Sequence, residues 1–384
     1  MINVLGIGLD YLMLQDNKVR GDVRKRQFDY ANKLRSLSLI VYSPKRLALK
    51  PQQWSINLCV YPTNSKNKAT FIFDACKIAL KICQERKIDI ITTEDPFMTG
   101  CVGYFLKKLL RMPLNIQIHN DFCDNKYWMG IRKINRLFNV IGKFIIKHSD
   151  TIRVGTNYEK EKISKKLRIL EEKIYVIPVN SEINKFKNVN EGKVRKKYIN
   201  GKFEKMLLFT GRLVAQKDIG TLLNAFNIVV QKRPRTLLII VGSGMQENIL
   251  KSLSHRLRLN NNVIFTGSID HDSLTEYVSA CDVYTISSIF EGTCIAMAEA
   301  MAAGKPVVAT GFAGACDLIR DGETGFIVNQ KDYKSFAAKV LYLLDNPVKA
   351  KAIGKNAERF ISERFENNKN IAEVIHLWEI TARK

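Results

Sequence analysis

Short apolar runs alternate with longer amphipathic stretches along the first half of the chain. The runs have the length and the β-branched composition of buried strands, and they occupy residues 4–8, 37–43, 56–62, 89–93, 114–120, 151–156 and 174–179. Stretches with helical periodicity lie between several of them, most clearly residues 22–35 and 70–87. Such alternation predicts a parallel sheet that helices cover on both faces.

The same alternation starts again after a polar segment. Residues 180–205 are rich in Asn, Lys and Gly, a composition typical of a domain linker. A second series of expected strands follows at residues 206–211, 236–244, 262–267, 283–288, 305–310 and 325–328. We therefore expect an α/β protein with two doubly wound, Rossmann-like domains, residues 1–183 and 184–365, facing a central cleft. A last helix at 366–384 has no strand partner in this pattern.

The composition is that of an ordinary soluble protein. Of 384 residues, 46% are hydrophobic and 26% are charged. No apolar run reaches the roughly 18 residues of a membrane-spanning helix, and the first residues lack the basic leader and cleavage site of a secretory signal. The eight cysteines never form C-x-x-C, so we interpret them as reduced thiols of a cytoplasmic protein without a metal framework.

Positive charge is concentrated in the first half. Residues 1–200 contain 38 Lys and Arg against 18 Asp and Glu, a net charge of +20, whereas residues 201–384 contain 23 against 19, a net charge of +4. This asymmetry suggests an anionic partner for the first half: nucleic acid, an anionic membrane surface or a phosphate-bearing substrate. The alternative is that the lysines only solvate the surface.

Two glycine turns follow expected strands, GIGLDY at 6–11 and GSGMQE at 242–247, where the glycines are Gly242 and Gly244. Neither turn has the third glycine of the dinucleotide fingerprint, which close helix–strand packing requires. The turns therefore argue against a nicotinamide or flavin enzyme, and no cofactor is expected.

The segment GRLVAQKD at 211–218 places two cations on one loop. Gly211 ends an expected strand, so Arg212 and Lys217 lie on the loop that leads to the next helix. Two fixed cations at this edge of a sheet can neutralise a diphosphate, Arg through its planar fork and Lys as a point charge. The alternative is an ordinary solvated loop.

Two glutamates stand in the apolar segment 287–310. Gly292 permits a tight turn, which places Glu291 before a helix and Glu299 about two turns into it. Both carboxylates can then face one ligand from different depths, as the paired hydroxyls of a sugar require. The alternatives are a turn residue plus an ion pair, or the acid and nucleophile of a glycoside hydrolase.

The helix in this segment is expected from Thr293 to Ala303 and is apolar nearly all round, so it should be buried. The backbone N–H groups at Thr293 and Cys294 would form its amino-terminal end. Such an end binds anions.

In combination these motifs resemble the retaining nucleotide-sugar glycosyltransferases of family 4, which have the two-domain GT-B fold. The resemblance rests on E-G-x6-E at 291–299 with AMAAGKPVVAT after it, GRLVAQKD, VGSG at 241–244 and the run from Gly314 to Val328. The first half agrees more loosely, through DPFMTG at 95–100, HND at 119–121 and GDVRKRQFDYANKL at 21–34.

The resemblance implies roles for the residues that match. Arg212 and Lys217 would stabilise the leaving diphosphate, Glu291 would bind hydroxyls of the transferred sugar, and His119 would lie beside the reacting sugar. These four form the expected catalytic set. Glu299 would bind the ribose.

The expected donor-binding set is largely backbone: Gly21, Gly211, Gly242, Gly244, Gly292, Thr293, Cys294 and Glu299. Two departures from the family pattern weaken the phosphate contacts expected from these loops, because Gly21-Asp22 and Ala313-Gly314 replace Gly-Gly pairs. The resemblance also implies that no divalent metal is needed, that the first domain binds the acceptor, and that the last helix packs back on the first domain.

The function expected from this resemblance is retaining transfer of a sugar from a nucleotide donor, a UDP-sugar before GDP-mannose. The acceptor would be a saccharide or a lipid-linked intermediate of cell-surface polysaccharide or glycolipid synthesis. A nucleotide-sugar epimerase of the same fold is the enzymatic alternative. A nucleic-acid-binding or scaffold protein ranks low, because the chain has no helix-turn-helix or aromatic-interleaved basic motif.

Two basic segments of the first half, 131–148 and 160–168, suggest contact with an anionic bilayer. The protein would then be cytoplasmic and peripheral on the inner face of the membrane. The alternative is that these are sheet-covering helices with Lys on their wet faces. Among the five histidines only His119 is expected in a site, and His148, His255, His271 and His376 are expected to be surface or packing residues.

Overall fold

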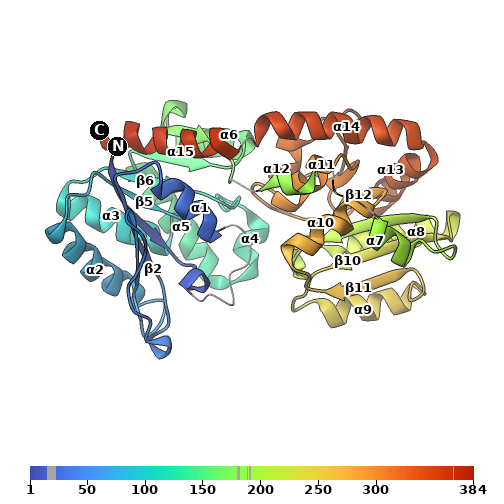
Figure 1. Ribbon diagram of the computed structural model, residues 1–384, viewed down its shortest axis with the longest axis horizontal. Coiled ribbons are helices and arrows are strands. Elements are labelled where there is room, and N and C mark those ends of the chain that lie inside the picture. The colour runs from blue at the N-terminus through green and yellow to red at the C-terminus, as the bar shows by residue number, and fades with distance from the viewer. Residues whose placement is uncertain (15–22, 180–181, 188, 190–191, 366) are drawn as a thin grey trace. The chain divides into compact units, whose positions relative to one another are not determined.

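The computed structural model describes residues 1–14, 23–179, 182–187, 189, 192–365 and 367–384. The chain divides into two compact units (Figure 1). Unit 1 comprises Met1–Asn180 and Asn367–Lys384, and unit 2 comprises Ser181–Glu366. The predicted site residue Gly21 lies outside the described residues.

Unit 1 is built on a sheet in which eight strands are described, in the order β3-β4-β2-β1-β5-β6-β7-β8. All neighbouring strands are parallel except β3, which pairs antiparallel with β4. The strands are β1 (Asn3–Gly8), β2 (Ser36–Val41), β3 (Gln52–Ser55), β4 (Leu58–Pro62), β5 (Ile90–Thr93), β6 (Leu114–Gln117), β7 (Thr151–Val154) and β8 (Ile174–Val176).

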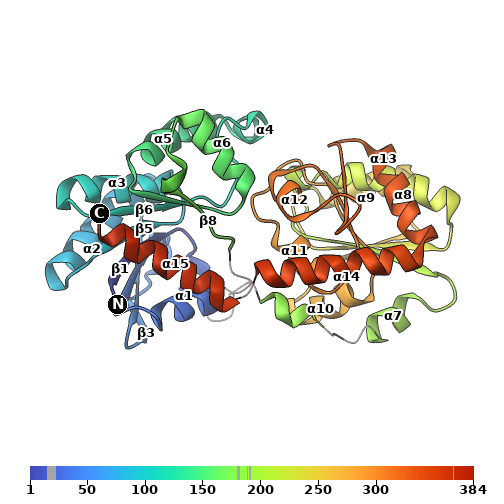
Figure 2. The same ribbon diagram turned by 90° about the horizontal axis from the view of Figure 1, so that it is seen from above.

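Helices cover both faces of this sheet, because its central strands are apolar on both sides (Figure 2). One face packs against α2 (Phe71–Glu85), α3 (Met98–Leu110), α5 (Lys133–His148) and α6 (Asn157–Leu167). The other packs against α1 (Val23–Ala31) and α15 (Asn367–Ala382). A short helix, α4 (Lys126–Ile131), precedes α5.

Helix α15 is fixed to unit 1 by buried polar contacts as well as by its apolar face. The Trp378 indole N–H donates to Asn115 Oδ1 (3.3 Å), and the Thr381 hydroxyl lies 2.6 Å from that of Thr151. Asn115 also accepts from Thr92 and donates to Thr151. These polar groups are satisfied only in one register of the helix on the sheet, so the end of the chain is held in a defined position.

Unit 2 is built on a parallel sheet with six described strands, in the order β11-β10-β9-β12-β13-β14. The strands are β9 (Lys205–Thr210), β10 (Thr236–Val241), β11 (Val263–Gly267), β12 (Val283–Ile286), β13 (Val307–Thr310) and β14 (Phe326–Val328). Its helices are α7 (Gly192–Tyr198), α8 (Ile219–Lys232), α9 (Glu247–Arg256), α10 (His271–Ala280), α11 (Ile295–Ala302), α12 (Ala313–Leu318), α13 (Tyr333–Asp345) and α14 (Pro347–Arg364).

The predicted α/β class with two Rossmann-like domains is therefore confirmed. Each unit has its own apolar core. In each unit the parallel strands bring several loops to one carboxyl edge of the sheet, where ligands of such folds bind. Among the described residues, no helix combines the length and the apolar character needed to cross a bilayer.

Candidate functional site

Lys217 and Glu291 form an ion pair at the carboxyl edge of the unit 2 sheet. Lys217 ends a short 3-10 helix (Ala215–Lys217) after β9, and Glu291 lies in the turn after β12. Lys217 Nζ is 2.7 Å from Glu291 Oε1, and both side chains are about nine-tenths buried. The Ser288 hydroxyl donates to the same carboxylate oxygen. Two residues predicted separately for the diphosphate and the sugar are thus in direct contact.

Arg212 follows the same strand but points into solvent. Its side chain makes no hydrogen bond or ion pair with any residue that the structure describes. Its guanidinium donors are therefore available to an anionic ligand. The loop thus carries two cations. Glu291 holds Lys217 in place, whereas Arg212 pairs with no residue that the structure describes.

Glycines allow the loops after β9 and β10 to touch through their backbones. A Cβ on Gly242, which has φ of +134°, would lie 1.9 Å from the carbonyl oxygen of Gly211. A Cβ on Gly244 would lie 2.4 Å from the carbonyl oxygen of Leu213. Since a real Cβ tolerates neither distance, these glycines fix the position of the Arg212 loop whether or not they also touch a donor.

Helix α11 begins two residues later than expected, at Ile295 rather than Thr293. The reason is local: Cys294 has an extended backbone (φ −80°, ψ 92°) and forms the cap. The turn before it packs against α12, because a Cβ on Gly314 would lie 2.2 Å from the Gly292 carbonyl oxygen. Burial raises the pKa of the Cys294 thiol well above its ordinary value, so this side chain stays a neutral thiol.

Glu299 lies on α11 and is 5% exposed. Its Oε1 is 2.9 Å from Nε2 of His271, the first residue of α10. The Phe186 ring meets the His271 ring edge-on at 5.4 Å between centroids. The expectation that His271 is only a surface or packing residue is therefore incomplete, because it contacts the carboxylate predicted to bind the ribose.

The phenol of Tyr284, on β12, is fully buried. Burial raises its pKa well above its ordinary value, and the nearby Cys294, Glu299 and Glu291 raise it further. The Tyr284 hydroxyl lies 2.7 Å from that of Thr210 at the end of β9. This contact satisfies the buried Tyr284 hydroxyl.

In unit 1, His119 follows β6 and lines a small cavity of about 30 Å³ together with Arg26, Glu94 and Arg153. Desolvation in this cavity, with the charges of Arg153 and Arg26, lowers the pKa of His119 to about 3. As a whole residue, His119 is exposed. His119 is neutral at pH 7.

Arg153 is a buried cation that the sequence analysis missed. It is 3% exposed and donates to the carbonyl oxygens of Ile177 (3.0 Å) and Pro178 (2.8 Å) and to Gln117 Oε1 (2.8 Å). All three of these hydrogen-bond partners are neutral. Its place inside an apolar strand pattern, TIRVG, is the signal that could have revealed it.

Two family models match adjoining parts of the chain. "Glycosyltransferase Family 4" matches residues 29–179 and "Glycosyl transferases group 1" matches residues 190–360. Together they cover most of the chain, which therefore belongs to the family 4 glycosyltransferases and has the GT-B fold.

Named relatives and solved structures agree with this family. The chain is 28% identical over 267 residues to the alpha-monoglucosyldiacylglycerol synthase of Streptococcus pneumoniae, covering 65% of this chain and 58% of that protein. It is 24% identical over 305 residues to an Escherichia coli UDP-Gal:alpha-D-GlcNAc-diphosphoundecaprenol alpha-1,3-galactosyltransferase, covering 78% and 77%. The structure of Anabaena HepE in complex with UDP-glucose matches with a TM-score of 0.76 at 21% identity, covering 98% of this chain and all of that one. The chain is thus a glycosyltransferase that uses a nucleotide-sugar donor in polysaccharide or glycolipid synthesis.

Proposed function

We propose that the protein is a retaining, metal-independent hexosyltransferase that uses a UDP-sugar. Its acceptor is a saccharide or a lipid-linked intermediate of cell-surface synthesis, and it works in the cytoplasm at the inner face of the membrane. The observation that carries the proposal is the arrangement at the carboxyl edge of unit 2, where Arg212 is available, Lys217 is paired with Glu291, and Glu299 lies further along α11.

The two cations suit the charge that develops during transfer. Breaking the bond between the anomeric carbon and the phosphate places negative charge on the diphosphate and positive charge on the sugar ring. Lys217 is already held in position by Glu291, so it needs no reorganisation to stabilise the diphosphate. The exposed Arg212 can contact the same diphosphate. Arg212 and Lys217 then bind the transition state more tightly than the ground state.

Glu291 fits a sugar-binding role better than that of a covalent nucleophile. Its Oε1 is occupied by Lys217 and by the Ser288 hydroxyl, which holds the carboxylate in one orientation. A carboxylate held in this way can accept hydrogen bonds from sugar hydroxyls. The departing phosphate oxygen then takes the proton of the acceptor hydroxyl on the same face of the ring, and the anomeric configuration is retained.

The donor is tested by a thermal-shift panel of UDP-, GDP- and ADP-sugars on the full chain. We expect the largest rise in the thermal midpoint with UDP-sugars, because a ligand stabilises only the state that binds it. The support for UDP is the named donor of the E. coli relative and the UDP-glucose bound in HepE. A larger rise with GDP-mannose would replace UDP in the proposal.

Incubation of the stabilising donor without acceptor then separates transfer from epimerisation. Accumulation of the free epimerised nucleotide sugar would contradict transfer. Formation of a glycoside only when an acceptor is added, with the anomeric configuration of the donor, supports it.

His271 supplies a prediction for the ribose-binding role of Glu299. Replacing it in His271→Leu removes the 2.9 Å contact to Glu299 while keeping an apolar side chain against Phe186. We expect the dissociation constant for UDP to rise about tenfold, the loss of one charge-assisted hydrogen bond. Calorimetric titration with UDP measures it. The exposed His255 on α9 offers the matched control His255→Leu, and equal affinities in the two variants would contradict a positioning role.

A further inference from the structure

Helix α5 exposes apolar side chains and buries polar ones, the reverse of an ordinary sheet-covering helix. The exposed residues recur every three or four positions, so they form one stripe along the helix. This apolar stripe consists of Ile134 (45% exposed), Leu137 (53%), Val140 (62%) and Phe144 (46%). The inward face carries Asn135, Asn139 and Gly142 ahead of the apolar pair Ile145 and Ile146.

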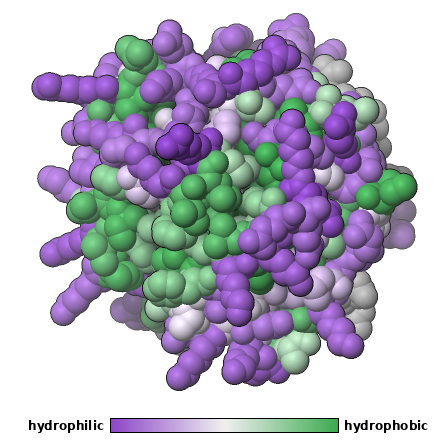
Figure 3. All heavy atoms as spheres, turned by 90° about the vertical axis from the view of Figure 1, so that its left-hand side faces the viewer, coloured by the Kyte–Doolittle hydropathy of each residue, from purple (hydrophilic) through white to green (hydrophobic). Residues whose placement is uncertain are grey.

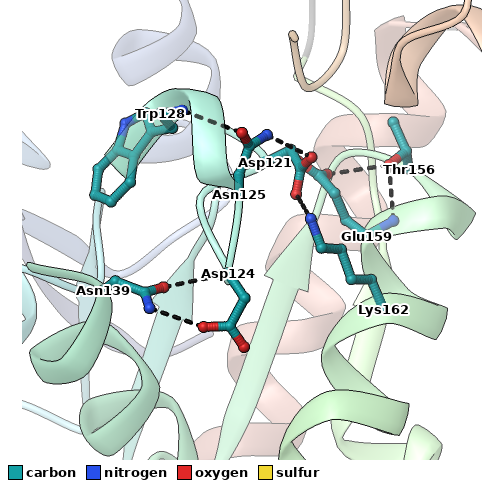
Figure 4. A network of polar contacts seen from close by, with 8 residues as sticks. All are labelled: Asp121, Asp124, Asn125, Trp128, Asn139, Thr156, Glu159 and Lys162. Atoms are coloured by element: carbon teal, nitrogen blue, oxygen red, sulfur yellow. Dashed lines mark hydrogen bonds and ion pairs between the residues drawn. The ribbon is translucent and has the colours of Figure 1, made fainter. Parts of the chain in front are cut away.

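The inward asparagines hold the helix in this orientation. Asn135 Nδ2 donates to the Trp128 carbonyl oxygen (2.7 Å). Figure 4 shows Asn139 facing Asp124, whose backbone N–H it accepts (3.0 Å) and whose carboxylate it donates to (2.8 Å). If α5 turned to bury the stripe, these hydrogen bonds would break, and apolar side chains would take the buried positions of the asparagines. The exposure of the stripe is therefore fixed by the fold.

Three more apolar side chains are exposed on the neighbouring helices α4 and α3. Ile131 at the end of α4 is 50% exposed, and Phe105 and Leu109 on α3 are 50% and 54% exposed. The Tyr104 ring of α3 contacts the Phe144 ring edge-on at 5.2 Å, which joins the two helices. The apolar stripe with these three residues is called the apolar patch below. Figure 3 shows the side of the protein with α2 and α3, where apolar side chains gather among long hydrophilic ones.

The surroundings of the apolar patch are positively charged. From Lys126 to His148 the chain has six Lys and Arg residues and no Asp or Glu. Lys133, Arg136 and Lys147 are exposed, and they form no ion pair with any residue within the described ranges. The acidic residues that flank this segment in the sequence are already paired, Asp124 with Lys143 (2.8 Å) and Asp150 with Lys107.

We propose that the apolar patch docks on an anionic phospholipid bilayer. The apolar side chains enter the boundary between headgroups and acyl chains, and Lys133, Arg136 and Lys147 lie among the lipid phosphates. This inference rests on the proposed peripheral location of the enzyme and names the surface and the lipid class that produce it.

Other occupants of the apolar patch fit less well. A second copy of the chain would bring the same cations face to face in a symmetric contact, which is repulsive. A protein partner would need an acidic apolar surface of matching shape. An anionic bilayer supplies negative charge and apolar depth together without any particular shape, and large exposed apolar patches mark such interaction sites.

Vesicle co-sedimentation of the full chain tests the proposal. The probes are vesicles of phosphatidylcholine alone and of phosphatidylcholine with about a third phosphatidylglycerol. We expect wild-type protein to bind the anionic vesicles at least tenfold more tightly, with binding that weakens as salt rises. The double variant Leu137→Gln/Val140→Gln and the double variant Lys133→Gln/Arg136→Gln should each lose at least tenfold.

Matched controls alter equally exposed residues outside the apolar patch. Ile56→Gln and Val348→Gln replace apolar side chains that are 95% and 83% exposed, and Lys81→Gln removes an exposed lysine of α2. These variants should bind vesicles like the wild type. The thermal shift produced by UDP checks that every variant is folded.

The outcomes separate this proposal from the proposed function. Equal binding to neutral and anionic vesicles, or wild-type binding by both double variants, overturns the docking surface. A concentration-dependent dimer in sedimentation velocity that Leu137→Gln/Val140→Gln dissolves, without vesicle binding, overturns it in favour of a second copy. Transfer to a soluble acceptor by the same variants is unaffected in every case, whereas absence of any transfer by the wild type contradicts the proposed function and not the docking.

Discussion

Replacing Arg212 by Ala should lower turnover by about two to three orders of magnitude, as removal of one preorganised charge stabiliser does. The fold should be unchanged, because the Arg212 side chain is exposed and makes no hydrogen bond or ion pair with the described residues. Initial rates at saturating donor measure the loss, and the thermal midpoint measures stability. Arg212 is therefore the clean test of diphosphate stabilisation.

Lys217→Ala should lose at least as much turnover, with a loss of stability in addition. Its removal leaves the Glu291 carboxylate about nine-tenths buried with only the Ser288 hydroxyl, which costs about 3 kcal/mol by analogy with broken buried pairs. Lys355→Ala on α14, where the lysine is exposed, is the control and should match the wild type. Turnover near the wild-type level in both Arg212→Ala and Lys217→Ala would falsify the proposed mechanism.

The alternation of apolar runs and amphipathic stretches was sufficient to predict the fold class, because strands buried on both faces are apolar throughout. It missed β3, since Gln52–Ser55 is a polar edge strand that only its antiparallel partner β4 stabilises. It also predicted 131–148 as one basic amphipathic segment, but not that its polar residues would face inward. That orientation depends on the asparagine contacts to residues of α4 and the loop before it.

The candidate site was predicted in part. Family motifs located Arg212, Lys217, Glu291 and Glu299, but the pairing of Lys217 with Glu291 joins residues 74 positions apart. His271 and Arg153 belong to no motif, and only folding places them beside Glu299 and in the cavity at His119. Contacts between residues distant in the chain are what a single sequence does not show.

Gly242→Ala should unfold or strongly destabilise unit 2 although it removes no chemical group. The added Cβ would lie 1.9 Å from the Gly211 carbonyl oxygen, and the backbone has φ of +134°. Backbone strain and overpacking together cost about 3–5 kcal/mol, which corresponds to a thermal midpoint roughly 10 °C lower for a unit of this size. Differential scanning calorimetry measures the shift.

The variant Gly201→Ala separates backbone strain from overpacking as the cause of the stability loss. Gly201 also has positive φ, +95°, but a Cβ there has no atom within 4 Å, so this variant carries the backbone strain alone, about 1–2 kcal/mol. If both variants lose the same stability, the contact between the β9 and β10 loops is not what matters. A larger loss in Gly242→Ala, with turnover reduced in the fraction that stays folded, means that the contact with Gly211 sets the position of the loop that carries Arg212 and Lys217. The glycines of the two motifs would then act on catalysis through the backbone.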